Sequence, residues 1–103
     1  MRLDKLLWFL RFARTRSRAQ AWICEGHIRR NGQRVERQGL PVGPGDVLTL
    51  PLARNVVVIE IVALPTRRGP AAEAQSCYRV LDDGGLVALA GSDVQELERE
   101  PPQ

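Results

Sequence analysis

The chain of 103 residues contains only two cysteines and one histidine. Cys24 and Cys77 do not form a CxxC pair, and a three- or four-ligand zinc site would need carboxylates from scattered positions. We therefore expect no metal site. The two thiols are expected to be reduced and mostly buried, as in a cytoplasmic protein, and a disulfide is the weaker alternative.

The sequence also lacks the sets of residues that catalysis requires. It contains no Ser, His and Asp set with a plausible geometry, no glycine loop suited to cradling a phosphate, and no paired carboxylates in a pocket-forming segment. We therefore expect neither an enzyme activity nor a cofactor.

No hydrophobic run is long enough to span a membrane, so we expect no membrane partner. The apolar run from Leu6 to Leu10 is too short for a secretory signal and is closed by Arg11. A mitochondrial presequence is harder to dismiss, because the segment is amphipathic and rich in arginine. Asp4 argues against it, and so does the continuity of the segment with the motifs that follow.

Lysine is nearly absent, since Lys5 is the only one among 15 basic residues. The first 37 residues hold ten basic and three acidic residues, whereas the rest of the chain holds five and nine. This asymmetry indicates an N-terminal face that binds a polyanion. Arginine suits that role, because its planar fork forms bidentate contacts with phosphate and stacks on bases.

Two helices are predicted in the N-terminal part. A stripe of leucines at helical spacing comprises Leu3, Leu6, Leu7 and Leu10. Trp8 and Phe12 lie off this stripe and need a second partner, which is either another helix of the chain or, less favoured, an RNA base. Ser17 and Gln20 form a capping-box pattern that predicts a second helix from about Arg18, ended by Gly26.

Asn31-Gly32 is a strong hairpin signal, and it predicts short strands over 27–30 and 33–35. Further strands are predicted over 47–50 and 56–64. A third helix is predicted over 71–81, with Pro70 in its first turn and residues 82–85 ending it. Residues 86–89 are ambiguous, and the acidic tail over 92–103 is expected to be solvated or disordered, with a short helix before the prolines as an alternative.

The predicted fold class is α+β, with two N-terminal helices packed on a short, twisted, mostly antiparallel sheet of about four to five strands, and a C-terminal helical extension. The expected domain organisation is residues 1–64 for an N-terminal domain with its following strand, residues 65–91 for the helical extension, and residues 92–103 for the tail.

Four motifs carry a resemblance to a known domain: RLDKLLW at 2–8, TRSRA at 15–19, GHIRRNGQRV at 26–35 and VGPGD at 42–46. Together they resemble the small RNA-binding domain first described in ribosomal small-subunit protein four. RRGPAAEAQSCY, residues 67–78, is similar to the C-terminal extension of the bacterial heat-shock protein fifteen family.

That resemblance implies a small protein that binds ribosomal RNA on the large ribosomal subunit, handles subunits retaining nascent chain-tRNA after faulty dissociation, and assists recycling under heat stress. Peptidyl-tRNA is a further implied partner, and we expect a monomer. Two positions depart from the family pattern: Arg30 stands where the family usually has valine, and His27 where it often has Lys or Arg.

The arginine-rich face is predicted from the arginines that flank the start of the second helix and those of the hairpin. Its predicted RNA-binding members are Arg2, Lys5, Arg11, Arg14, Arg16, Ser17, Arg18, His27, Arg29, Arg34 and Arg37, with Arg67 and Arg68 as secondary candidates. Arg30 points away from Arg29 by strand alternation and is left out.

A surface of this kind suits structured RNA, which proteins read largely through backbone shape and 2′-hydroxyls. Residues 2–46 alone do not separate the rescue role from another small RNA-binding factor in ribosome assembly or translation regulation. DNA binding is a further alternative, open to any basic surface.

Overall fold

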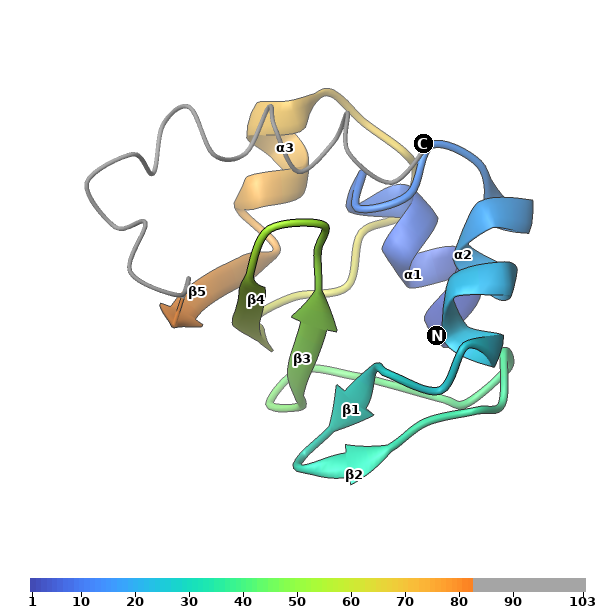
Figure 1. Cartoon of the computed structure of the whole chain (residues 1–103). Helices are drawn as coiled ribbons and strands as arrows, with labels where there is room; N and C mark the ends of the chain where they lie inside the picture. The colour runs from blue at the N-terminus through green and yellow to red at the C-terminus, as the bar shows by residue number, and fades with distance from the viewer. Residues whose placement is uncertain (83–103) are drawn as a thin grey trace.

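A computed structural model describes residues 1–82 of the chain as helices packed against one sheet (Figure 1). The predictions for residues 86–89 and 92–103 lie outside the described residues. No helix within the described part is long and apolar enough to cross a bilayer.

The first helix, α1 (Leu3–Phe9), buries the predicted leucine stripe, each leucine of which is at most 2% exposed. The helix ends where Arg11 takes a left-handed φ of 68°. The backbone N–H of Arg11 donates to the carbonyl of Trp8 at 3.1 Å, and that of Phe12 donates to Leu7 at 3.0 Å. This is a Schellman end with arginine in the position that usually holds glycine.

The second helix, α2 (Arg16–Cys24), starts earlier than predicted. Its N-cap is Thr15, whose Oγ1 accepts a hydrogen bond from the backbone N–H of Arg18 at 3.1 Å. The prediction of Ser17 as the cap was therefore wrong, because Thr15 is the residue with extended backbone and the Gln20 amide donates to Asp4 instead of closing a capping box. The predicted end was right, since Gly26 follows the helix with a φ of 82°.

Within residues 1–82, five antiparallel strands form one sheet in the order β2-β1-β3-β4-β5. They are β1 (Arg29–Arg30), β2 (Gln33–Arg34), β3 (Val47–Pro51), β4 (Val56–Ile61) and β5 (Tyr78–Asp82). The predicted hairpin turn is confirmed, because Asn31 and Gly32 both have positive φ, at 52° and 85°. The predicted α+β class is confirmed, although β1, β2 and β4 are shorter than expected.

The third helix, α3 (Ala71–Gln75), covers only the start of the helix predicted over 71–81. Pro70 is its N-cap rather than part of its first turn. The chain then turns, and residues from Tyr78 onward pair with β4 as the edge strand β5. The prediction was wrong because local propensity does not report that β4 has an open edge to be paired.

Phe12 is buried within the chain, as its place off the leucine stripe requires. It is 1% exposed, and its ring lies 5.0 Å from the ring of Tyr78, centroid to centroid. Tyr78 of the strand β5 is therefore one of its partners, in the same core cluster as Ala19 and Ile23 of α2. Trp8 is half-buried, with its ring 5.5 Å from that of Phe9.

The segment after the hairpin fastens the start of α1 to the sheet. The backbone N–H groups of Leu3 and Asp4 donate to the carbonyls of Leu40 and Gln38 at 2.9 and 3.1 Å. The core then forms between the helices and the inner sides of β3 and β4, from Leu48, Leu50, Val57, Ile59 and Ile61. Of the two free thiols, Cys77 is buried as expected, whereas Cys24 is exposed.

The hairpin turn provides a test of this fold. A Cβ at Gly32 would meet no atom within 4 Å, so a substitution there is penalised only through its φ of 85°. We expect Gly32→Ala to lower the free energy of unfolding by about 1–2 kcal/mol, measured by urea denaturation. Gly43 is equally uncrowded without a positive φ, so Gly43→Ala is the matched control and should change little. Equal effects of the two substitutions would contradict the turn assignment.

Candidate nucleic-acid interface

A buried carboxylate organises the start of both N-terminal helices. The side chain of Asp4 is 0% exposed. Arg2 donates to it through Nε and Nη2, both at 3.1 Å, and Gln20 donates through Nε2 at 2.9 Å. The backbone N–H of Lys5 adds a bond of 2.7 Å, and Nε of Arg16 a longer one of 3.4 Å.

These donors determine the charge of the carboxyl group. Burial alone would raise the pKa of Asp4, because it removes water from the ionised form. The hydrogen bonds from Arg2, Gln20, the Lys5 backbone and Arg16 outweigh burial and hold the pKa of Asp4 well below its usual range. Asp4 is therefore ionised at neutral pH, and the two arginines are its counterions.

The Asp4 contacts leave the side chains of Arg2 and Arg16 partly exposed, at 53% and 39%. Each guanidinium has five N–H donors, so neither is saturated by one carboxylate. Arg11 donates through Nε to the carbonyl of Gly69 at 2.6 Å.

The turn before α2 and its first turn carry the next group of predicted residues. Arg14, Ser17 and Arg18 are all exposed there. They lie beside the first N–H groups of a nine-residue helix, where a negative charge is favoured. Arg16, in the same turn, shares the Asp4 carboxylate with Arg2.

The hairpin carries a second group beyond the C-terminal end of α2 (Figure 1). His27 and Arg29 are exposed while Ile28 between them is buried, so the predicted outward face is confirmed. Nη1 of Arg29 donates to the carbonyl of Gly32 at 3.2 Å. Arg34 is 64% exposed and lies 3.7 Å from a carboxylate oxygen of Glu36 at the hairpin exit.

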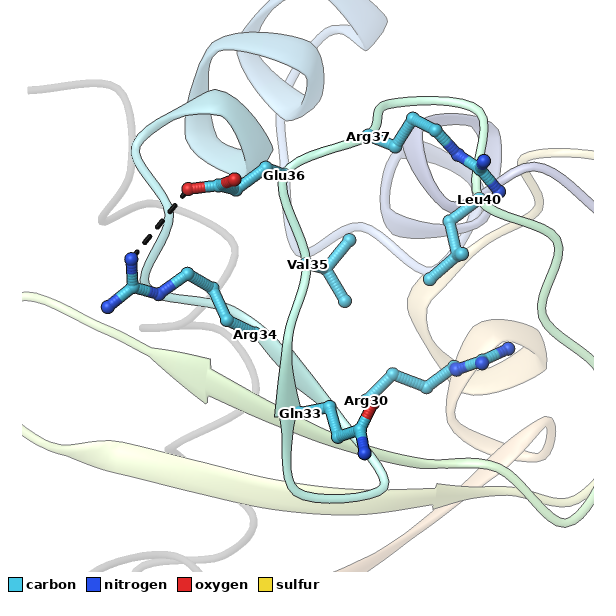
Figure 2. Close-up of a pocket in the computed structure, with 7 residues that line it drawn as sticks. All are labelled: Arg30, Gln33, Arg34, Val35, Glu36, Arg37 and Leu40. Carbon is cyan, nitrogen blue, oxygen red and sulfur yellow. Dashed lines mark ion pairs between the residues drawn. The ribbon is translucent and has the colours of Figure 1, made fainter.

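A shallow hollow of about 530 Å³ lies beside the hairpin exit. Figure 2 shows the side chains of Arg30 and Arg37 on one side of the chain segment 33–37, and those of Arg34 and Glu36 on the other side. Arg37 was a predicted RNA-binding residue, whereas Arg30 was set aside. Nη1 of Arg30 donates to the carbonyl of Pro41 at 3.1 Å.

The remaining candidates make internal contacts. Nε of Arg68 donates to the carbonyl of Trp8 in the last turn of α1 at 3.0 Å. Arg67 forms a bidentate pair with Glu73 at 3.1 and 2.7 Å. That pairing, chiefly through hydrogen bonding, lowers the pKa of Glu73. Lys5 lies over the ring of Phe9, with Nζ 5.3 Å from the centroid.

Within residues 1–82, no group of three or more His, Cys, Asp or Glu side chains is placed to hold a metal ion. The candidate interface comprises arginine side chains, the exposed His27 and the start of α2.

Comparisons with known proteins agree with this geometry. The model of the S4 domain family matches residues 1–48. A solved structure of heat shock protein 15 from Vibrio cholerae, described as trimeric, superimposes with a TM-score of 0.75 at 31% identity, covering 93% of this chain and 94% of that one. The chain belongs to the heat shock protein 15 family. The resemblance seen in the sequence is thereby confirmed.

Curated relatives point the same way. The heat shock protein 15 homolog of Haemophilus influenzae is 40% identical over 79 residues, which are 77% of this chain and 60% of that protein. Heat shock protein 15 of Escherichia coli is 36% identical over 78 residues, which are 76% of this chain and 58% of that protein. The chain thus spans about 60% of the length of these curated relatives.

The buried carboxylate of Asp4 makes the free energy of unfolding depend on pH. Because the pKa of Asp4 is lowered on folding, its contribution is present above the unfolded pKa of about 4 and is lost as the pH falls from there toward the folded pKa. We expect Asp4→Asn to lower the free energy of unfolding by about 2–3 kcal/mol at pH 7. The difference from the unmodified protein should shrink steadily below about pH 4.

Urea denaturation across pH 2 to 8 measures both effects. The control is Glu36→Gln, which removes a carboxylate from an exposed pair that contributes at most about 1 kcal/mol. An Asp4→Asn protein with the same acid dependence as the unmodified protein would contradict the assignment.

Proposed function

We propose that the chain binds structured ribosomal RNA through its arginine-rich face. The observation that carries this proposal is the arrangement of exposed arginines around the Asp4 network, the start of α2 and the β1–β2 hairpin. The S4 domain match over residues 1–48 covers both helices and the hairpin and supports it. Forked guanidinium groups spread over one surface suit the phosphates and 2′-hydroxyls of folded RNA.

The proposed contacts fall into two groups along α2, whose nine residues span about 13 Å. The helix group comprises Arg2, Lys5, Arg14, Arg16, Ser17 and Arg18, and the hairpin group comprises His27, Arg29, Arg34 and Arg37. We assign Arg11, Arg67 and Arg68 to holding the C-terminal extension, because their guanidinium groups donate to backbone carbonyls or to Glu73.

We further propose that the RNA belongs to free large ribosomal subunits that carry nascent chain-tRNA, and that binding assists their recycling under heat stress. Membership of the heat shock protein 15 family supports this role, with peptidyl-tRNA as a further partner. The role requires a cytoplasmic protein without catalysis of its own. We keep the monomer as the proposed state of this chain, although the Vibrio cholerae neighbour is described as trimeric.

The alternative is another small RNA-binding factor in ribosome assembly or translation regulation. One observation favours it: the small ribosomal subunit protein uS4 of Gloeobacter violaceus is 41% identical over 49 residues, which are 48% of this chain and 24% of that protein. The RNA-binding surface alone is therefore compatible with either ribosomal subunit.

Phosphate contacts make binding depend on salt. If about five to eight phosphates are neutralised, a plot of log K against log salt concentration should have a slope near −4 to −7. Arg14→Ala removes an exposed arginine and should make the slope less steep by about 1. Filter binding to ribosomal RNA measures both slopes.

Arg79→Ala is the control, because Arg79 lies on β5 and pairs with Glu60, away from the proposed interface. Its slope should match that of the unmodified protein. A salt dependence close to flat in the unmodified protein would refute the arginine-rich face.

Sedimentation of the tagged protein separates the two biological roles. We expect the protein in the free large-subunit fraction of a sucrose gradient, with more of it there after heat stress. A variant carrying Arg14→Ala and Arg29→Ala together should leave that fraction, because both side chains are proposed to contact phosphate. Exclusive association with the small subunit would favour the alternative role, and association with no RNA would refute both.

A further inference from the structure

Arg30 of β1 lines the hollow at the hairpin exit, and it lies on the core-facing side of that strand. Ile28 is 0% exposed, and Arg30 follows it on the same face of the strand at a half-buried position. Such a position normally holds an apolar residue. The guanidinium group of Arg30 lies at the edge of the core, where its Nη1 donates a hydrogen bond to the carbonyl of Pro41.

A second arginine shares the hollow. Among the seven lining residues the one ion pair joins Arg34 to Glu36, which point away from Arg30 and Arg37 (Figure 2). Glu36, the acidic residue among the lining residues, is thus paired with Arg34 and not with Arg30 or Arg37. Within the described part of the chain, Arg37 is exposed and its side chain has no hydrogen bond or ion pair. The hollow therefore presents two cationic groups without a carboxylate between them.

Its remaining lining is apolar. Val35 is 4% exposed and Leu40 is half-buried, and both belong to the core or pack against it. A ligand for this site should combine a flat apolar face with an adjacent negative charge. Guanidinium planes and aliphatic side chains bind the faces of bases, and guanidinium forks bind phosphate, so one nucleotide provides both features.

We propose that this hollow receives a single unpaired nucleotide of the bound RNA, with its base against Arg30 and Leu40 and its phosphate against Arg37. A paired nucleotide keeps its base inside the helical stack and cannot enter. A volume of about 530 Å³ lies in the range of small-ligand sites, which is about 300–1,000 Å³. This inference rests on the proposed RNA binding and adds a preference for helices interrupted by an unpaired nucleotide.

The test compares two short RNA hairpins that are identical except for one extra unpaired nucleotide in the stem. In filter binding at constant salt, the unmodified protein should bind the interrupted hairpin about tenfold more tightly. Arg30→Met keeps an apolar stem of similar length but removes the guanidinium. It should lose the preference and bind the fully paired hairpin within about twofold of the unmodified protein.

Two further variants define the chemistry. Arg30→Lys keeps the positive charge without the stacking plane and should recover little of the preference. Arg54→Ala, in the turn between β3 and β4, removes one arginine outside the hollow and should keep the preference in full. Thermal unfolding followed by circular dichroism verifies that each variant is folded.

A fluorescent base reports the contact directly. With 2-aminopurine as the unpaired nucleotide, binding of the unmodified protein should change the emission, and binding of Arg30→Met should not. If the unmodified protein binds both hairpins equally, the nucleotide site is refuted while the proposed RNA binding stands. If it binds neither hairpin nor ribosomal RNA, the proposed function itself fails, and the nucleotide site with it.

Discussion

The ionised carboxylate of Asp4 joins parts of the chain that are far apart in sequence. It is fully buried, and it accepts hydrogen bonds from Arg2 before α1 and from Gln20 and Arg16 on α2. A buried charge is costly unless it is paired, so the two helices must stay in the one arrangement that supplies these donors. Arg2 and Arg16 make these contacts while their side chains stay partly exposed. Stability and charge placement therefore depend on one interaction.

The basic surface depends on backbone contacts as much as on arginine content. Leu3 and Asp4 donate from the start of α1 to carbonyls at 38–40, so the hairpin exit lies against α1. At the other end of α1, Arg68 donates to a carbonyl of the last helical turn and Arg11 donates back to Gly69. These two arginines contribute to docking of the C-terminal extension.

The sequence proposes members for the candidate interface, but it does not indicate what holds them in place. Sequence reasoning placed His27 and Arg29 on an exposed strand face, because strand alternation is a local property. It missed the role of Asp4, whose only local sign was an acidic residue in the first turn of a helix. It also set Arg30 aside, because alternation gives the direction of a side chain but not whether the core leaves an opening there.

The sequence by itself determined the features whose physical cause lies within a few residues. Those are the helix that buries the leucine stripe, the Asn31-Gly32 turn and the stop at Gly26, which depend on helical periodicity and on left-handed backbone. Only the tertiary structure decided that Tyr78 begins an edge strand, that its ring lies against Phe12, and that Arg16 and Gln20 donate to the buried carboxylate. Each of those outcomes depends on groups more than ten residues apart, and no local propensity reports which of them meet.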